Sequence, residues 1–482
     1  MILRHTTFNL IGLGAPLLVA VVTIPALIHA LGPDRFGLLT MVWAVVSYFG
    51  LFDLGLGRAL TQQLSLTFAR GDDEVVGPLT ATATILMMGL GVLAGIAMAL
   101  GAHWGVDLIK NVPDRAEAVR SVYAMALAMP AVILTSGFRG VLEAKAAFGT
   151  VNLIRLPLGL FTFLGPLGVV WAGHASLDLI TLVLALGRIV GCIVHAICAW
   201  RVLSPVQRKF RVGKKEARLL SASGGWLTVS NIISPIMGYI DRFVIGAVVS
   251  ASAVAYYATP NEMVTKIWII PGAVTAVLFP AFAARMAVRG TDNLPLVRAS
   301  IVTLYITILP ITVGLAVFAR ELLTLWISAD FASHSTVLLQ IFAVSMLVSC
   351  TAQIPFTLIQ GAGKPRTTAL LHCAILPLYL LGLWLFARSF GVTGAALAWL
   401  LRIIIDACTL FILSAPLLGQ PRYYFINRHS IALGMLAALM FSCMFLGNLW
   451  LRCLGVLIGL GLAVFYTKPV AMLVAYRAKK SS

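Results

Sequence analysis

The chain has 482 residues, of which 60% are hydrophobic and only 11% are charged. Soluble domains carry about 25% charged residues, so this composition excludes a water-soluble globule, and it is far too hydrophobic for a disordered chain. The net charge of +18 would suit a nucleic-acid-binding protein. However, the lysines and arginines lie between long apolar runs, which favours a membrane surface and predicts no binding of nucleic acid.

Apolar runs long enough to cross a bilayer recur along the whole chain, and they predict an all-α polytopic membrane protein. Crossing about 30 Å of hydrocarbon takes roughly 20 apolar residues. The first run is too long for a signal-peptide core and no cleavage site follows it, so we interpret it as a retained span. Fourteen transmembrane helices are predicted near residues 8–31, 38–60, 78–102, 121–138, 151–173, 178–203, 224–250, 254–280, 296–319, 335–360, 367–388, 392–415, 430–447 and 450–474.

The longest polar stretch follows the sixth predicted span and divides the chain. We expect an N-terminal six-helix bundle over 1–203, a basic cytoplasmic linker over 204–223 and a second six-helix bundle over 224–415. Two extra helices and a basic tail would occupy 416–482. The linker could lie on an anionic leaflet, with anionic membrane lipids as partners, or it could serve only to anchor the topology.

The basic residues also orient the chain. When both termini are placed in the cytoplasm, most lysines and arginines fall on the cytoplasmic side, as the positive-inside rule requires. This topology needs an even number of spans.

The two predicted six-helix sets show signs of an internal repeat. The loop GVLEAKAAFGT in the first set resembles LIQGAGKPRTT in the second, and Arg188 and Arg402 are separated by nearly the same offset as these loops. Because each set has an even number of spans, both would enter the membrane from the same side. They are therefore predicted to be parallel repeats, an arrangement common in transporters.

Charged side chains within the spans are the main functional candidates, because each costs at least about 2.5–3.5 kcal/mol at the bilayer centre. Arg188 and Arg402 lie near mid-span, where two guanidinium groups could bind a phosphate or diphosphate. Arg188 has no acidic residue three or four positions away, so it needs a partner elsewhere, a cavity or a ligand. Arg402 could instead be neutralised by Asp406 on the same helix face.

Two further pairs lie in the seventh and eighth spans. Glu262 and Lys266 have the spacing of a self-neutralised helical pair, although Glu262 could also line a cavity and couple transport to protons. Asp241 and Arg242 are adjacent and point about 100° apart. We therefore expect them to pair with other helices.

In the second span, Asp53 and Arg58 are about 140° apart around a helix and cannot simply pair. Arg58 lies near the cytoplasmic end, where it could be only an anchor. No zinc-like spacing of cysteine or histidine, nucleophile motif or Walker A sequence occurs. The sequence thus predicts no metal, no cofactor and no enzymatic activity, and it leaves the coupling ion, proton or sodium, open. Lone histidines, expected at packing positions, are His29, His195 and His372.

Two segments carry a family resemblance: LGPDRFGLLTMVWAVVSYFGLFDLGLGRALTQQLS near the N-terminus and YIDRFVIGAVVSASAVAYYATPNEMVTK in the middle. They resemble bacterial polysaccharide-biosynthesis flippases of the multidrug/oligosaccharidyl-lipid/polysaccharide exporter superfamily. The resemblance implies two six-helix bundles forming a V around a central cationic cavity. The last two helices exceed the common twelve-span pattern and could form a lipid-facing groove.

The resemblance also implies a function. Undecaprenyl-diphosphate-linked oligosaccharides would be flipped from the cytoplasmic to the periplasmic leaflet of the inner membrane, for O-antigen or exopolysaccharide biosynthesis. Partners would include a polysaccharide polymerase and chain-length proteins. The predicted substrate-binding cations are Arg188, Arg402, Lys266 and Arg242. The predicted coupling or structural acids are Glu262, Asp241, Asp53 and Asp406, with Arg58 as a candidate at the cytoplasmic end.

The main alternative is a cation-coupled drug or metabolite antiporter of the same superfamily. A cavity for cationic drugs should hold an excess of acidic groups. Here the intramembrane cations and acids nearly balance, which favours an anionic substrate only modestly. A glycosyltransferase would usually need a carboxylate cluster or a sizeable polar loop, and the sequence has neither.

Overall fold

The computed structural model describes the backbone of residues 2–49, 55–287, 292–422 and 424–481. Side chains are described over the same ranges, except at positions 2–15, 48–49, 221–232, 234–235, 287, 429 and 466–481. Within this part of the chain every regular element is a helix. The chain divides into two compact units, Met1–Ala255 and Tyr256–Ser482.

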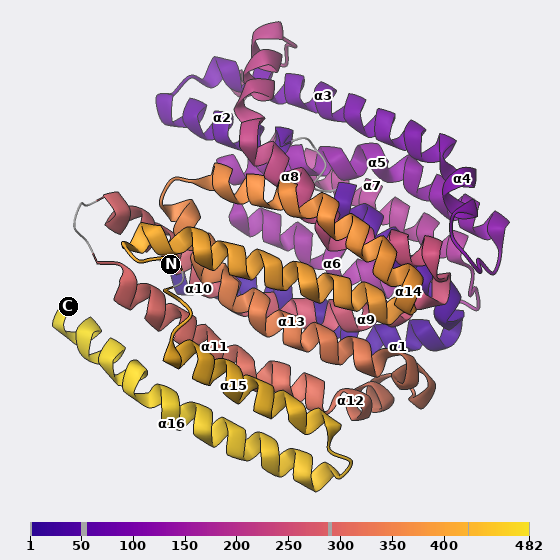
Figure 1. Ribbon diagram of the computed structural model, residues 1–482. Helices are drawn as coiled ribbons and strands as arrows, with labels where there is room; N and C mark the ends of the chain where they lie inside the picture. Colours follow the sequence, from indigo (N-terminus) through magenta and orange to yellow (C-terminus); the bar gives the residue numbers. More distant parts are fainter. Residues whose placement is uncertain (1, 50–54, 288–291, 423, 482) are drawn as a thin grey trace. The chain divides into compact units, whose positions relative to one another are not determined.

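The first unit holds eight α-helices and one short 3-10 helix (Figure 1). They are α1 Ile2–Phe49, α2 Leu56–Arg70, α3 Asp73–Leu100, α4 Ala102–Asp107, α5 Arg115–Ala144, α6 Phe148–Trp171, α7 Leu177–Val202, η1 Val206–Arg208 and α8 Lys214–Val248.

The second unit begins within α9 and runs to the C-terminus. Its elements are α9 Ala251–Thr265, η2 Lys266–Trp268, α10 Ile269–Ala287, α11 Leu294–Val317, α12 Ala319–Trp326, α13 Ala329–Gly361, α14 Pro365–Ser414, η3 Ala415–Leu418, α15 Arg428–Ser442, η4 Cys443–Phe445 and α16 Leu449–Ser481.

The two longest helices, α1 and α14, each contain two predicted spans. Gly32 in α1 has φ 75° and Gly391 in α14 has φ 59°, so each interrupts its helix with a backbone conformation that glycine adopts without steric cost. Pro33 directly follows Gly32, and proline suits the first turn of the helix that starts there. The chain thus reverses direction on a single glycine at both places.

The fourteen predicted spans correspond to helices of the structure. Among the described residues, nine helices are long and apolar enough to cross a membrane. In this number α1 and α14 each count once, although each contains two of the predicted spans. Shorter apolar helices occur in α15 and α16, and α8 covers the seventh predicted span. One boundary differs from the prediction of 38–60: α1 is described to Phe49, and beyond the undescribed residues 50–54 a separate helix, α2, starts after the left-handed residue Gly55.

One helix forms the centre of each unit. In the first unit α5 packs against α7, α3 and α2, with Met125 and Met129 fully buried. In the second unit α13 packs against α14, α11, α12 and α10, with Phe342 and Leu358 fully buried. These helices are the fourth span of their respective sets. The matching central positions support the parallel repeat of the two halves.

The predicted domain limits stay a prediction, because compactness and sequence repeat are different criteria. By its contacts α8 packs on α1, α2 and α3 and lies in the first compact unit. By sequence repeat it would open the second six-helix set. The predicted linker contains η1, and its last residues already belong to α8.

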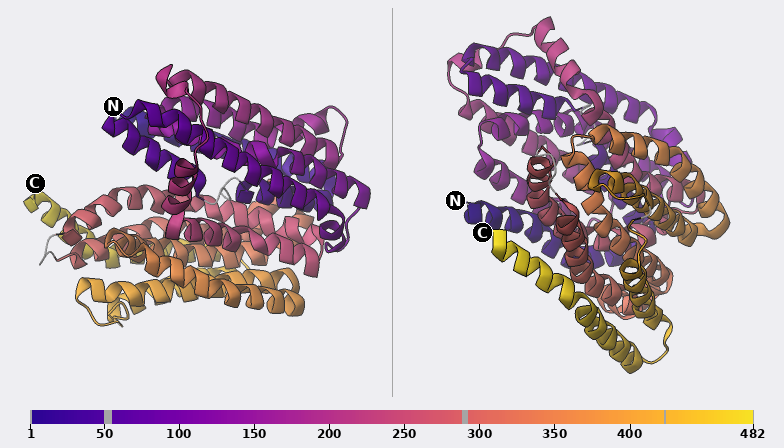
Figure 2. Two further views of the ribbon diagram at one scale, coloured as in Figure 1. Left: turned by 90° about the horizontal axis from the view of Figure 1, so that it is seen from above. Right: turned by 60° about the vertical axis from the view of Figure 1, so that its left-hand side comes forward.

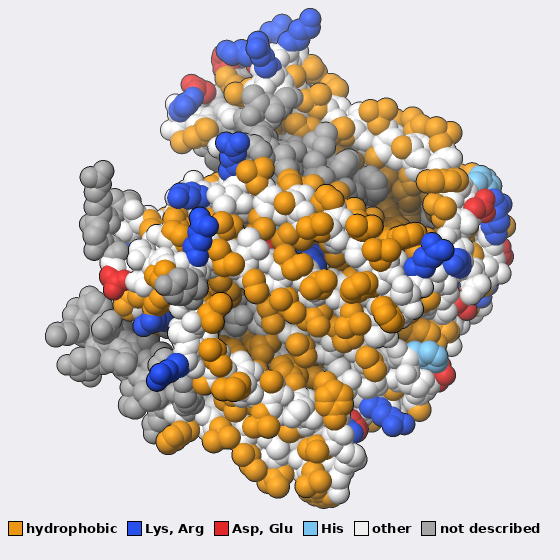
Figure 3. Space-filling view, viewed as in Figure 1, with side chains coloured by type: hydrophobic (Ala, Val, Ile, Leu, Met, Phe, Trp, Pro, Cys, Tyr) orange, Lys and Arg blue, Asp and Glu red, His pale blue; other side chains and the backbone are white. Residues whose placement is uncertain are grey.

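Exposed apolar side chains cover much of each unit, as expected of surfaces that face lipid. On the face drawn in Figure 3 they spread over the helices, whereas lysines and arginines gather mostly toward the margins. The C-terminal helices α15 and α16 lie side by side in Figure 2, next to α11. Gly455 and Gly459 permit this contact, because a β-carbon there would meet Cys443 and Met440.

Close packing at Gly91 and Gly95 joins α3 to α5. A β-carbon on Gly91 would lie 2.5 Å from Cα of Pro130, a backbone atom that cannot easily move, whereas one on Gly89 would meet nothing within 4 Å. We predict that Gly91→Ala lowers the free energy of unfolding by about 1–3 kcal/mol through overpacking. Gly89→Ala should be neutral or slightly stabilising. Thermal unfolding in detergent compares the two, and equal midpoints would contradict this packing.

Candidate functional site

Arg188 lies about halfway along α7, as predicted. Its Nη2 donates a hydrogen bond of 3.1 Å to Oγ1 of Thr162 on α6, and within the described residues no carboxylate lies close enough to pair with it. A guanidinium carries five N–H donors. Thr162 takes one of them, which leaves donors for water or for an anionic ligand.

Arg402 occupies the corresponding place in the second part of α14. Its guanidinium lies 5.2 Å from the ring centroid of Tyr379 and 5.7 Å from that of Trp399. Its Nε is buried and has no hydrogen-bond partner in the described part of the chain. The alternative pairing with Asp406 does not form, because the Asp406 carboxylate lies instead against His372, 3.5 Å from Nε2.

The two arginines share one more feature. Arg188 reaches back from α7 to α6, and Arg402 reaches back to Tyr379 in the first part of α14. Each arginine therefore contacts the span that precedes it in the chain. The contact is a hydroxyl in one unit and an aromatic ring in the other.

The predicted pair on the eighth span is present. Lys266 Nζ lies 2.6 Å from Glu262 Oε2, and both side chains are partly exposed. The contact that the spacing predicts is therefore present, and a coupling role for Glu262 stays a prediction. Such exposed pairs contribute only about 0–1 kcal/mol to stability.

Asp241 and Arg242 are almost completely buried, with exposed fractions of 1% and 2%. The backbone N–H of Arg242 donates to Oδ1 of Asp241, and its Nη1 donates to the carbonyl of Thr40 on α1 at 3.2 Å. The Arg242 guanidinium also lies over the ring of Tyr239. The bond to Thr40 joins α8 to α1, so Arg242 contacts another helix as expected, and the pairing of Asp241 with another helix stays a prediction.

The remaining candidates come from the second span. Arg58 is exposed on α2, and Asp53 lies outside the described residues.

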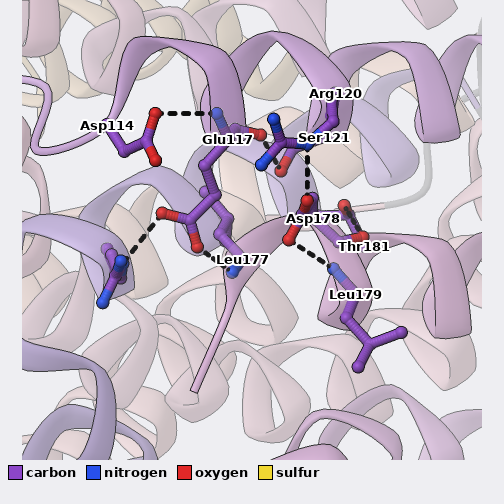
Figure 4. A network of polar contacts seen from close by, with 9 residues as sticks. Asp114, Glu117, Arg120, Ser121, Leu177, Asp178, Leu179 and Thr181 are labelled. Atoms are coloured by element: carbon purple, nitrogen blue, oxygen red, sulfur yellow. Dashed lines mark hydrogen bonds and ion pairs between the residues drawn. The ribbon is translucent and has the colours of Figure 1, made fainter. Parts of the chain in front are cut away.

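A polar network at the start of α5 and α7 was not predicted (Figure 4). Asp114 caps α5 by accepting from the Glu117 backbone N–H. The Glu117 side chain, in a residue only 4% exposed, accepts from Nε of Arg35 at 3.0 Å and from the backbone N–H of Leu177. Beside it, Arg120 pairs with Asp178 at 2.6 Å. Glu117 thereby holds the break in α1 and the first turns of α5 and α7 together.

An apolar cavity of about 870 Å³ lies within the first unit. Its walls come from α1, α3, α5 and α8, and they include Met41, Val45, Met98, Met125 and Phe243. Ligand pockets typically measure about 300–1,000 Å³. The nearly complete lack of polar lining suits a hydrocarbon chain rather than a sugar.

Solved structures identify the fold as that of a transporter of the MOP superfamily. A multidrug resistance MATE family transporter in an inward-facing conformation matches with a TM-score of 0.70 and 13% identity, over 86% of this chain and 94% of that one. A MOP superfamily transporter from Pyrococcus furiosus, described by the reverse polarity of its binding pocket, matches with a TM-score of 0.60 and 15% identity, over 87% and 95%. At these identities the likeness establishes the fold alone.

Sequence comparison identifies the family. Residues 27–336 match the model of the polysaccharide biosynthesis protein family, and the chain belongs to that family. A protein from Shigella flexneri named "Putative O-antigen transporter" is 28% identical over 412 residues, which are 85% of this chain and 96% of the relative. The chain is therefore a multi-pass membrane transporter of the MOP superfamily and not an enzyme, as its sequence predicts.

The Glu117 network generates a stability prediction. Glu117→Ala leaves Arg35 and the N–H of Leu177 without their acceptor, so the free energy of unfolding should fall by about 2–3 kcal/mol, less than a fully buried pair would cost because Arg35 is partly exposed. Thermal unfolding measures the change.

The control for this prediction is Asp107→Asn. Asp107 is exposed in α4, where two hydrogen bonds from Arg115 hold the pKa of its carboxyl below the usual range. Because exposed pairs contribute little, this variant should move the midpoint far less. A Glu117→Ala midpoint equal to that of Asp107→Asn would contradict the structural role of Glu117.

Proposed function

We propose that this transporter flips undecaprenyl-diphosphate-linked oligosaccharides from the cytoplasmic to the periplasmic leaflet of the bacterial inner membrane by alternating access, for O-antigen or exopolysaccharide biosynthesis. The observation that carries the proposal is the pair of mid-span arginines, Arg188 and Arg402, neither of which is neutralised by a carboxylate in the described part of the chain. Membership of the polysaccharide biosynthesis family supports it.

The chemistry of the cargo fits these side chains. A diphosphate is anionic and must be stabilised at membrane depth, and arginine binds phosphate oxygens through two parallel N–H donors. Thr162 holds one N–H of Arg188 and leaves others for the ligand. The apolar cavity of the first unit suits a length of polyprenyl chain. By contrast, Lys266 and Arg242 are engaged by Glu262 and Thr40, so they are weaker candidates for binding cargo.

The second candidate is a cation-coupled drug or metabolite antiporter, which the fold shared with MATE transporters favours. A cationic drug needs an acid that is not already neutralised. Glu262 is paired with Lys266 and Asp241 is buried beside Arg242, so these acids are poor sites for such a cargo. These two acids therefore disfavour a cationic cargo, and among the described candidates Asp406 beside His372 is the acid left for this second function.

The proposal includes an orientation and partners. Both termini would be cytoplasmic, so that the basic segments face that side. A polysaccharide polymerase and chain-length proteins would use the flipped lipid on the periplasmic side. A reporter enzyme that works only in the cytoplasm should therefore be active when it is fused after Lys480, and one that works only in the periplasm should be inactive there. Activity of the periplasmic reporter would contradict the orientation.

Substitution of the mid-span arginines tests the cargo. Arg188→Ala and Arg402→Ala should each lower the export of lipid-linked glycan at least tenfold at normal protein levels, because each removes a charge-assisted contact with the diphosphate, and such contacts contribute about 1.5–3 kcal/mol. The measurement is the accumulation of lipid-linked oligosaccharide on the cytoplasmic leaflet. The matched control is Arg201→Ala at the exposed end of α7, which should export normally. Normal export by Arg188→Ala would contradict the proposed role.

A further inference from the structure

Asp406 is an isolated acid. It is the only aspartate or glutamate in the sequence after Asp330. It lies in the second part of α14, two turns before Ser414 and thus about 12 Å from that end of the helix. An ionised carboxylate at this depth must be neutralised, hydrated or hydrogen-bonded.

The group that meets Asp406 is His372, from the first part of α14. Its Nε2 lies 3.5 Å from Oδ1 of Asp406, and the side chains are 15% and 19% exposed. Oδ1 is shielded from solvent and has no hydrogen-bond partner in the described residues. The His372 ring stacks on Phe356 of α13 at 6.1 Å and 13°, which fixes the plane of the imidazole.

Within the described part of the chain, the elements packed most closely on this pair carry few other charged groups. α14 packs on α13 and η3. The titratable side chains of α13 are Asp330, His334 and Cys350, the first two at the opposite end of the helix, and η3 has none. On α14 itself the titratable or charged side chains are Arg366, His372, Cys373, Tyr379, Arg388, Arg402, Asp406 and Cys408.

Arg402 is the nearest cation along the helix, one turn before Asp406. Its guanidinium is directed to the rings of Tyr379 and Trp399 and forms no ion pair with Asp406 in the described part of the chain. The state of the acid therefore depends on His372.

We propose that His372 and Asp406 form a proton-binding site that controls the affinity of Arg402 for an anion. A proton from solution binds Nε2 of His372, and the new N–H donates to Oδ1 of Asp406. The pair then changes from a net charge of −1 to zero. No other bond forms or breaks.

The consequence for Arg402 follows from electrostatics. Without the proton, a negative charge one helical turn away competes with an anionic ligand for the guanidinium. With the proton, the pair is neutral and Arg402 attracts the anion more strongly. Coupling between such sites is typically about 5- to 150-fold in affinity. The effect of the proton on anion binding rests on the proposed function, because it assumes that a diphosphate cargo binds Arg402. The proton site formed by His372 and Asp406 does not depend on that assumption.

The proton site is tested without any cargo. Full-length protein labelled with 15N-histidine is placed in lipid nanodiscs, and the His372 signal is identified by its loss in His372→Gln. On acidification we expect the nitrogen signals of His372 to report the added proton in the wild type, and this response to differ in Asp406→Asn. The internal control is His334, which stacks on Tyr256 and should look the same in both proteins. An unchanged His372 signal in Asp406→Asn would overturn the site.

A second variant keeps the test valid if Asp406→Asn does not fold. In His372→Gln the Asp406 carboxylate loses the N–H donor that acidification creates in the wild type, so the infrared carboxylate band of Asp406 should no longer shift between high and low pH. A band that still shifts as in the wild type would overturn the pairing.

The coupling is tested by flipping of lipid-linked oligosaccharide in proteoliposomes. Between pH 8 and pH 5.5 the apparent affinity of the wild type should rise about tenfold, and it should be independent of pH in His372→Gln. A wild-type profile that is flat, while His372 still titrates with Asp406, would overturn the link to Arg402. Failure of the wild type to flip this lipid at any pH would contradict the proposed function instead, and the magnetic resonance result would still decide the proton site.

Discussion

A charged side chain in hydrocarbon must find a partner, and this constraint organises both units of the transporter. Glu262 at the end of α9 and Lys266 at the start of η2 satisfy it with each other, and Arg242 satisfies it by reaching a backbone carbonyl of α1. The mid-span arginines meet it only in part, through one hydroxyl at Arg188 and two aromatic rings at Arg402. Incomplete neutralisation is costly for a structural residue. It is useful where an anion has to bind and leave again.

Local pairs could be predicted from the sequence, and pairs between remote segments could not. The spacing of Glu262 and Lys266 predicts their contact, and the length of the apolar runs predicts the fourteen spans. The same spacing fails for Arg402 and Asp406, because the rings of Tyr379 and Trp399 hold the guanidinium and His372 meets the acid. Packing decides which faces of two spans meet. The hydropathy of the sequence does not predict those faces.

The Glu117 network is an intermediate case. Asp114 has the position of a helix cap, and Glu117 is an acid in the first turn that follows it. This pattern in the sequence is enough to predict the start of α5. The partners Arg35 and Leu177 come from other parts of the chain, and their approach depends on how α1 and α7 pack on α5.

The central helices explain why the candidate residues lie where they do. α5 and α13 are buried on most sides and carry the core of their units. α7 and α14 pack on them and carry Arg188, which contacts α6, and Arg402, which lies over Tyr379 and Trp399. A rigid core helix beside a helix with polar groups allows substitution of functional side chains without loss of the fold.

The reversals at Gly32 and Gly391 leave the chain with almost no loop between the spans they join. In the proposed orientation both reversals face the outside of the membrane. For a member of the polysaccharide biosynthesis family, the shape of these two hairpins in the proposed orientation is thus set by one glycine each.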